Sequence, residues 1–294
     1  MLFQAFLGLS YICNLNCKHC YAKTVKNNKS FSIDFVKSLI DDLYDLGVIK
    51  IVLSHGEPLA YPYIQEALTY MKEKGFYVVM MSNGILLTQE KITFLEKVGL
   101  DKIYISLDSC DPNIYDDFRG VKGSFQKVMA CFDLLGKSKL KRAVSSTISE
   151  LNKNELEDVI DFAISKGAHE ISMLTIRDNK SYTGLLPYAE YRDLIVKLWQ
   201  SYKKNYSNRI NLLFHDKYIY SFLEEYLYGE EKEKVKNQNE CVAGKKRITI
   251  APDGNVYPCT FVFQKMGNVF EKSVKDIYEE SKYNQFKTCI TCKL

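Results

Sequence analysis

Short apolar runs alternate with longer amphipathic segments over residues 4 to 174. Apolar runs bounded by turn residues are typical of buried strands, whereas apolar residues that recur every third or fourth position indicate helices. The runs predict strands at Gln4–Leu9, Lys50–Leu53, Tyr77–Met81, Ile103–Leu107, Ala143–Ile148 and Glu170–Leu174. The amphipathic segments predict helices at 33–46, Tyr63–Lys74, Gln89–Val98, Gly123–Leu135 and Lys153–Lys166.

The order of these elements predicts an α/β fold. The first helix has the clearest boundaries, with Ser32 as its N-cap and Gly47 as its stop signal. Six strand–helix units in series imply a parallel sheet that curves toward a barrel. We therefore expect a partial (β/α)6 TIM-like barrel.

The alternation ends after Leu174, where helices are expected around Tyr188–Lys204 and Asp216–Leu227. The charged run at 229–240 predicts a solvated linker. Beyond it, a β-hairpin that turns at Asp253 and Gly254 and a helix at Val274–Glu280 predict a small cysteine-rich extension. The expected division is a barrel at 1–180, a helical, substrate-facing region at 181–240 and a cluster-binding extension at 241–294.

Composition narrows the class of protein. Of 294 residues, 46% are hydrophobic and 26% are charged, which excludes collagenous, low-complexity and wholly disordered chains. The net charge of +4 does not indicate a nucleic-acid surface. No window approaches the roughly 18 apolar residues of a membrane span, and the N-terminus lacks the features of a signal peptide. We expect a cytoplasmic protein that binds neither nucleic acid nor membrane.

Nine cysteines are the main chemical feature, and seven lie in two clusters. The first has the spacing C-x3-C-x2-C and the second belongs to the extension; the two clusters are Cys13, Cys17, Cys20 and Cys241, Cys259, Cys289, Cys292. Clustered thiolates bind zinc or iron–sulfur clusters. Three cysteines can hold three irons of a four-iron cube and leave the fourth iron open for an exogenous ligand, whereas four complete the shell.

Two alternatives concern individual residues. His19 lies between Cys17 and Cys20 and could complete a zinc site, which would make the protein a non-catalytic, zinc-stabilised binding module. The isolated Cys131 falls on the apolar face of a predicted helix, so we expect it to be buried. We expect Cys110 to have a packing role as well.

Four segments resemble the radical S-adenosylmethionine (SAM) enzymes. CNLNCKHC at 13–20, followed by Tyr21, resembles their cysteine signature. SHGEPL at 54–59 resembles their GGEP segment, and SNG at 82–84 and ISLDS at 105–109 follow the next two strands. All lie at the carboxyl ends of predicted strands, where a barrel places its active site.

The extension resembles the Twitch form of the SPASM domain. Cys241 is followed by Gly254, Cys259 and the pair Cys289-x2-Cys292. This resemblance implies one auxiliary 4Fe–4S cluster, in addition to the cluster that binds SAM. A second auxiliary cluster is not expected, because no cysteine follows Cys292.

The resemblance also implies roles for single residues. Glu57 would bind the methionyl amine of SAM, and Arg119 its carboxylate. Ser106, Asn83 and Asp108 would face the ribose.

Two further residues are candidates for catalysis. His55 stands where the family usually has glycine, and it predicts either a packing role or an acid–base role. Arg177, after the sixth strand, would bind a substrate carboxylate or cap the barrel rim.

The implied activity is reductive cleavage of SAM to a 5′-deoxyadenosyl radical that abstracts a hydrogen atom from substrate, with flavodoxin or ferredoxin as electron donor. We expect an oxidoreductase or maturase that oxidatively modifies or crosslinks a ribosomally made peptide. Cys13 leaves no room for a preceding leader-binding segment, so we expect a peptide substrate to use a separate leader-peptide recognition protein or to dock directly. The alternatives are two-electron oxidation (dehydrogenation) of a small-molecule alcohol or sugar in a biosynthetic pathway and, less favoured, epimerisation of a peptide or sugar.

Overall fold

The computed structural model describes residues 2–24, 29–176, 184–214, 223, 242–260, 262 and 264–281. Several predictions concern residues outside these ranges, namely the roles of Arg177, Cys241, Cys289 and Cys292, the linker at 229–240, and all of the helix predicted at Asp216–Leu227 except Leu223.

The described strands form one ten-stranded sheet in the order β10-β9-β8-β1-β2-β3-β4-β5-β6-β7. Strands β1 to β7 are parallel in sequence order, and β8 pairs parallel with β1. The strands are β1 (Gln4–Gly8), β2 (Lys50–Ser54), β3 (Tyr77–Ser82), β4 (Lys102–Ser106), β5 (Arg142–Ile148), β6 (Glu170–Thr175), β7 (Asn211–Phe214), β8 (Arg247–Ile250), β9 (Asn255–Tyr257) and β10 (Gly267–Asn268).

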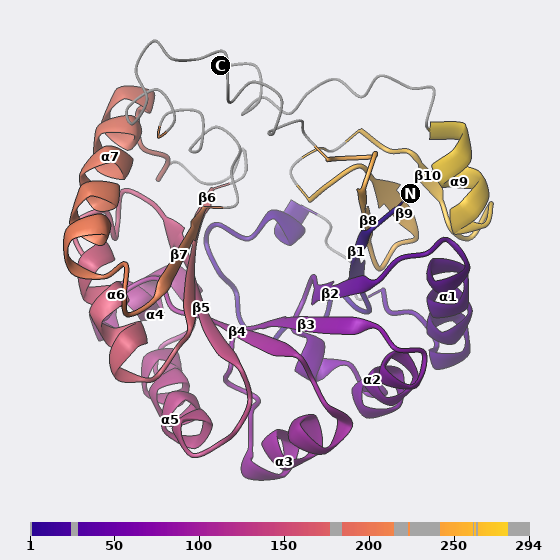
Figure 1. Cartoon of the computed structure of the whole chain (residues 1–294), viewed down its shortest axis with the longest axis horizontal. Helices are drawn as coiled ribbons and strands as arrows, with labels where there is room; N and C mark the ends of the chain where they lie inside the picture. The colour runs from indigo at the N-terminus through magenta and orange to yellow at the C-terminus, as the bar shows by residue number, and fades with distance from the viewer. Residues whose placement is uncertain are drawn as a thin grey trace.

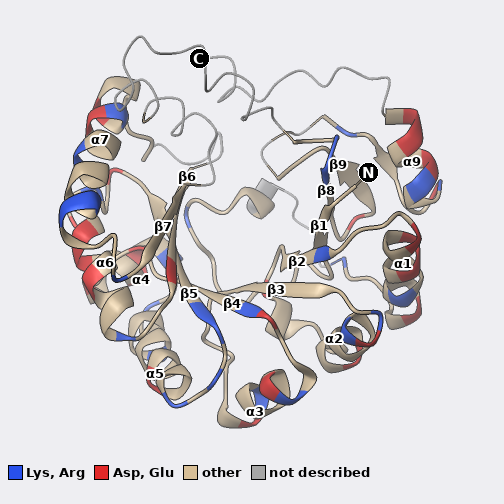
Figure 2. Ribbon diagram, viewed as in Figure 1, with Lys and Arg blue, Asp and Glu red and all other residues tan. Residues whose placement is uncertain are grey.

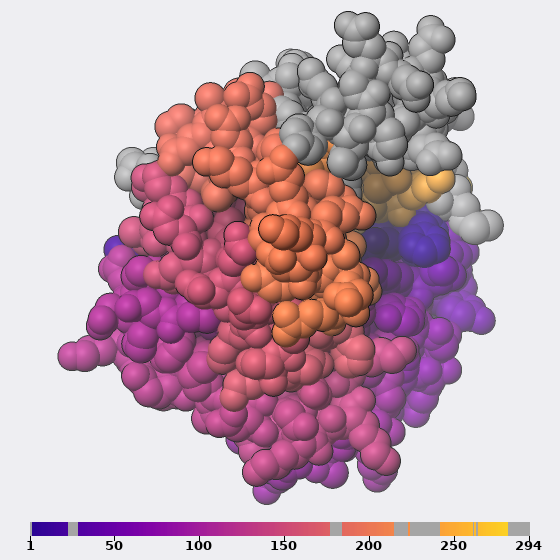
Figure 3. All heavy atoms as spheres, turned by 60° about the vertical axis from the view of Figure 1, so that its left-hand side comes forward, coloured from indigo at the N-terminus to yellow at the C-terminus, as the bar shows by residue number. Residues whose placement is uncertain are grey.

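Helices surround the convex side of this curved sheet (Figure 1). The α-helices are α1 (Ile33–Asp45), α2 (Ile64–Glu73), α3 (Gln89–Val98), α4 (Pro112–Arg119), α5 (Ser124–Gly136), α6 (Leu156–Ser165), α7 (Tyr188–Asn205) and α9 (Val274–Ser281). Two short 3-10 helices, η1 (Tyr21–Thr24) and η2 (Pro58–Ala60), follow β1 and β2. In the space-filling view, the orange segment that contains α7 lies against the pink segment that contains α5 and α6 (Figure 3).

The main core lies between the sheet and the helices. In α1 the side chains of Val36, Leu39, Ile40 and Leu43 are buried against the strands. Ser32 accepts a hydrogen bond from the Phe35 backbone N–H, as expected for its N-cap position. Because the sheet is parallel and covered by helices, its strands are apolar along most of their length.

The α/β fold and its mostly parallel, partial-barrel sheet are confirmed. The hairpin of β8 and β9 also turns at Asp253 and Gly254 as predicted, with Gly254 in the left-handed region at φ +83°. Among the described residues, no helix is long and apolar enough to cross a membrane.

Several elements were not predicted, including the two-residue strand β10 and the 3-10 helices η1 and η2. β7, at Asn211–Phe214, adds a seventh parallel strand within the region expected to be helical. Its four residues are too short for a clear periodic signal. α4 was also missed, although Asp111 and Pro112 are a typical helix start and Gly120 a typical stop. The β8 strand joins the barrel sheet directly, so the extension is continuous with the barrel through β1.

Candidate active site

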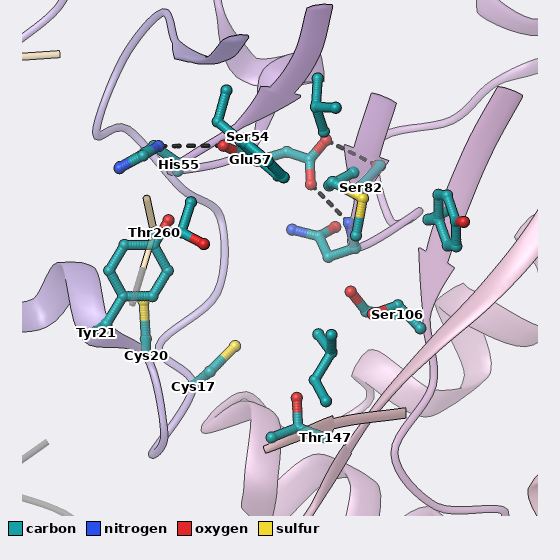
Figure 4. Close-up of a pocket in the computed structure, with 18 of the residues that line it drawn as sticks. Cys17, Cys20, Tyr21, Ser54, His55, Glu57, Ser82, Ser106, Thr147 and Thr260 are labelled. Carbon is teal, nitrogen blue, oxygen red and sulfur yellow. Dashed lines mark hydrogen bonds between the residues drawn. The ribbon is translucent and has the colours of Figure 1, made fainter. Parts of the chain in front are cut away.

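A cavity of about 270 Å³ lies on the concave side of the sheet. Its walls include the loop after β1, the carboxyl ends of several strands, and Thr260 from the extension (Figure 4). The carboxyl edge of a parallel barrel is the expected place for a catalytic site. Of the predicted site residues, the cavity brings together Cys13, Cys17, Cys20, His55, Glu57, Asn83, Ser106 and Arg119.

The cysteine loop is held from two sides by backbone hydrogen bonds. The Glu57 N–H donates to the Ile12 carbonyl over 2.9 Å. From the other side, the N–H groups of Asn16 and Lys18 donate to carbonyls at the end of α4, over 3.2 and 2.9 Å. These contacts fix the loop between β2 and α4.

Two polar side chains lie beside the sulfur atoms. Arg119 Nη1 is 3.7 Å from Cys17 Sγ, and Asn83 Nδ2 is 3.9 Å from Cys13 Sγ. Donors placed this way stabilise a sulfur atom that carries negative charge, as a thiolate ligand of a cluster does. Three thiols of one loop on a shared cavity, with N–H donors beside two of them, fit the ligand set of an iron–sulfur cluster.

Glu57 is the most buried carboxylate on the cavity wall, with 2% of its surface exposed. Its Oε1 accepts hydrogen bonds from the Ser82 hydroxyl over 2.8 Å and from the Leu59 N–H over 3.1 Å. Its Oε2 accepts from the Asn83 N–H over 2.7 Å. Burial raises the pKa of Glu57, although these three donors oppose the rise. The carboxylate is therefore fixed in orientation and is suited to binding a cation, whose charge would favour its ionised form.

The segment after β3 connects Glu57 to the cysteine loop. Asn83 Nδ2 donates a hydrogen bond to Asn14 Oδ1 over 2.8 Å, and Asn83 Oδ1 accepts one from the Ile85 N–H over 3.0 Å. Asn83 thus joins β3 to the loop after β1, and its side chain is already engaged on both sides. The SNG segment at 82–84 therefore lies at the cavity, at the carboxyl end of β3, as its sequence position predicted.

Arg119 forms a buried ion pair with Asp108, with 2.5 Å between Nη2 and Oδ2. The second Asp108 oxygen accepts a hydrogen bond from the Thr147 N–H over 2.8 Å. Burial by itself would lower the pKa of Arg119, but the charge of Asp108 outweighs it and raises the pKa. Asp108 does not line the cavity with the other described residues, because its carboxylate faces Arg119 and the β5 backbone. The observed partners of the Asp108 carboxylate are thus Arg119 and the Thr147 backbone, and its expected contact with ribose remains a prediction.

His55 has a left-handed backbone, with φ +68°, although it is not glycine. Its Nδ1 lies 3.2 Å from the Ser54 hydroxyl, and its ring packs edge-on against Tyr11 and Tyr21. A Cβ on Gly8 would come within 2.9 Å of the His55 side chain, so this histidine lies against the β1 backbone. His55 thus has a backbone conformation that favours glycine, and its side chain forms part of the cavity wall.

Sequence reasoning did not single out Thr147 and Thr260 as cavity residues. Thr147 is on the inner face of β5, and alternation along the strand could have identified it. Thr260 follows Cys259, a buried residue of the second cysteine cluster, and brings the extension to the cavity. Nothing local in the sequence predicts that approach.

The other cysteines behave as expected. Cys131 is 2% exposed in the core, where burial raises its pKa to about 12. Cys110 is partly buried against the same core, with Sγ 3.6 Å from the Asp158 carbonyl. His19 stacks on Phe118 at a ring separation of 4.2 Å, and within the described ranges no three His, Cys, Asp or Glu side chains are grouped closely enough to hold a single metal ion.

Comparison with known proteins agrees with this geometry. Residues 8–163, more than half of the chain, match the Radical SAM superfamily, and residues 241–293 match SPASM, an iron–sulfur cluster-binding domain. The chain is 24% identical over 279 residues to an AdoMet-dependent heme synthase of Methanosarcina barkeri, covering 92% of this chain and 80% of that protein.

Two other relatives are longer than this chain. The antilisterial bacteriocin subtilosin biosynthesis protein AlbA of Bacillus subtilis is 28% identical over 284 residues, which cover 95% of this chain and 60% of AlbA. The crystal structure of Streptococcus suis SuiB superposes with a TM-score of 0.79 at 18% identity, over 97% of this chain and 66% of SuiB. The chain belongs to the radical SAM superfamily and carries a SPASM cluster-binding domain, so its cofactors are S-adenosylmethionine and two 4Fe–4S clusters.

Proposed function

We propose that this chain is a maturase that oxidatively modifies a ribosomally made peptide. The observation that carries the proposal is the single cavity that the thiols of the cysteine loop share with Glu57 and Arg119. When bound there, the cluster and SAM supply a carbon-centred radical that removes a hydrogen atom from the substrate. The protein's own residues position the reactants and exclude water.

Each predicted ligand then has a specific task. Cys13, Cys17 and Cys20 ligate the first cluster, and Arg119 supports Cys17 through its guanidinium. Glu57 binds the methionyl amine, because a buried and oriented carboxylate is a strong site for a cation. Arg119 also offers its charge to the methionyl carboxylate, and its Nε has no hydrogen-bond partner among the described residues.

The remaining cavity residues serve the ribose and the second cluster. Ser106 and Asn83 face the ribose, while Asp108 acts on the site by holding Arg119 in place. Cys241, Cys259, Cys289 and Cys292 would ligate the auxiliary cluster, which when bound would supply an acceptor for one electron. A flavodoxin or ferredoxin would be the electron donor, and a peptide substrate would reach the site through a separate recognition protein or by direct docking.

Relatives support a peptide substrate. AlbA takes part in making a bacteriocin, and SuiB has been solved bound to its precursor peptide SuiA. The second candidate is oxidation of a small molecule, which the similarity to an AdoMet-dependent heme synthase favours, since heme is not a peptide.

The first test measures iron, sulfide and 5′-deoxyadenosine after anaerobic reconstitution. Wild type should contain about eight irons per chain and should release 5′-deoxyadenosine from SAM under reductant. Cys17→Ala should keep about four irons and release none, whereas Cys110→Ala, the matched control outside both clusters, should behave as wild type. Zinc in place of iron, or release by Cys17→Ala, would overturn the proposal.

A second measurement separates the two candidate substrates. Peptides encoded beside the gene should lose about 2 Da in mass after incubation with enzyme, SAM and reductant, because each two-electron oxidation removes two hydrogen atoms. Consumption of a small alcohol or sugar, with every neighbouring peptide unchanged in mass, would favour the second candidate.

A further inference from the structure

The base of the cavity, at the amino ends of the strands, differs from the cysteine end. Side chains alternate along a strand, so the strand register shows which residues share the inner face. Gln4 pairs with Lys50 on one side and with Arg247 on the other, and Glu170 lies further around the curve. Gln4, Lys50 and Arg247 line the same cavity as the cysteine loop. The basic segments of β2, β4 and β8 lie inside the ring of helices (Figure 2).

Among the described residues, four charged side chains lie at this level of the inner face: Lys50, Lys102, Arg247 and Glu170. Lys102 lies 3.2 Å from Glu170, which also accepts a hydrogen bond from the Tyr104 hydroxyl. The carboxylate of Glu170 is therefore already paired with Lys102. Within the described part of the chain, neither Lys50 nor Arg247 has an ion-pair partner, and Arg247 Nε is buried without a hydrogen bond.

Each of these two cations lies near an aromatic ring. Lys50 Nζ is 6.0 Å from the centre of the Tyr77 ring, and Arg247 Cζ is 5.5 Å from that of Phe6. Such contacts hold a cation in place while leaving its donors available. Burial, together with the positive charges of Lys102 and Arg247, lowers the pKa of Lys50, with Glu170 opposing this effect. An anion bound between the two cations would relieve this repulsion.

We propose that Lys50 and Arg247 form a carboxylate-binding subsite at the base of the cavity. This inference rests on the proposed function and names a feature of its substrate: a peptide that carries a carboxylate at a set distance from the reacting C–H bond. Carboxylates are the anions that an unmodified peptide can offer, from an Asp or Glu side chain or from its C-terminus. The arginine fork and the lysine ammonium are both suited to bind one.

The strand geometry sets that distance. Lys50 and Ser54 are the first and last residues of β2, and Ser54 lies at the cysteine end. A rise of about 3.3 Å per residue and a strand tilt of about 36° separate these two levels by roughly 10 Å along the barrel axis. The substrate carboxylate should therefore lie about two to three residues of extended peptide from the modified position.

The test measures binding of short peptides to the reconstituted holoenzyme by saturation-transfer NMR, without reductant. The probes are acetylated and amidated pentapeptides with four glycines and a central glutamate or glutamine, and an acetylated pentaglycine with a free C-terminus. The glutamate peptide should bind at least tenfold more tightly than the glutamine peptide. If the pentaglycine with a free C-terminus binds as tightly as the glutamate peptide, a peptide C-terminus can also supply the carboxylate. If it binds more weakly, the carboxylate comes from an Asp or Glu side chain.

Variants connect that preference to the two cations. Lys50→Gln and Arg247→Gln should each abolish it, whereas Lys50→Arg and Arg247→Lys, which keep the charge, should retain most of it. Lys37→Gln, which removes a partly exposed lysine paired with Glu66, is the matched control. Thermal melting of each variant verifies folding.

Equal binding of the glutamate and glutamine peptides to wild type, with the free C-terminus giving no advantage, would overturn the inference. A preference that persists in both charge-removing variants would also overturn it. Because binding is measured without SAM cleavage, these outcomes are independent of whether 5′-deoxyadenosine is formed, which tests the proposed function.

Discussion

Arg119 lies between Asp108 and Cys17, with its guanidinium 2.5 Å from the Asp108 carboxylate and 3.7 Å from the Cys17 sulfur. Asp108 and Arg119 are 1% and 5% exposed. One buried cation therefore connects the end of β4 to the cysteine loop. The ion pair fixes the arginine, and the arginine in turn supports a predicted ligand of the first cluster.

Breaking this pair should be costly because it leaves a charge buried and unpaired. We expect Arg119→Met and Asp108→Asn each to lower the free energy of unfolding by about 3–5 kcal/mol. The double variant should lose much less than the sum of the two, since neither charge remains. Urea unfolding followed by circular dichroism measures these values. As a control, Asp117→Asn, which disrupts an exposed pair with Lys18, should lower the free energy of unfolding by less than about 1 kcal/mol. If the losses caused by the Asp108 and Arg119 substitutions were additive in the double variant, this explanation would be contradicted.

At position 120, the contact between α4 and the cysteine loop leaves no space for a side chain. Its φ is +68°, and an added Cβ would lie 2.3 Å from the Asn16 carbonyl oxygen. Gly120→Ala should therefore displace the loop and reduce the iron bound after reconstitution. Gly123→Ala is a close control, because Gly123 has φ +79° and open space around it. It should cost only about 1 kcal/mol of backbone strain and keep its iron. Equal iron contents in the two variants would show that the contact is unimportant.

The left-handed backbone at His55 predicts an unusual order of stability. His55→Gly and His55→Ala both remove the imidazole ring, but alanine keeps a Cβ at φ +68° and glycine does not. The glycine variant should thus be more stable than the alanine variant by about 1 kcal/mol, the reverse of their order in a helix. Chemical denaturation of the two proteins in parallel measures the difference. The prediction fails if alanine is equal to glycine or better.

Glu57 should make stability depend on pH. Burial raises its pKa above that of an exposed glutamate, which is about 4.3, so the folded state favours the protonated form. Its contribution to stability is largest below about pH 4.3 and is lost as the pH rises through the folded-state pKa. Glu57→Gln removes the titration, so the stability of wild type relative to this variant should fall with increasing pH and then level off. Melting temperatures of both proteins from pH 5 upward test the slope, and a constant difference would refute it.

Much of the fold was predictable because its signals are local. The helix at Gln89–Val98 agrees with its predicted bounds, and the first helix starts after its N-cap Ser32 and ends shortly before Gly47. Side-chain spacing and capping depend on neighbours within a few residues, which the sequence displays directly. The cysteine spacing and the segments after β2, β3 and β4 likewise indicate the family without any structure.

The sequence by itself thus determined the α/β class, the family and the residues at the strand ends. Only the tertiary structure decided that Asp108 faces Arg119, that His55 lies against Gly8, and that Lys50 and Arg247 share the base of one cavity. These pairs join elements whose separation is set by the closing of the sheet, with β8 pairing to β1 after nearly the whole chain has intervened. Local periodicity carries no information on such pairing, because it depends on how the strands twist and pack together.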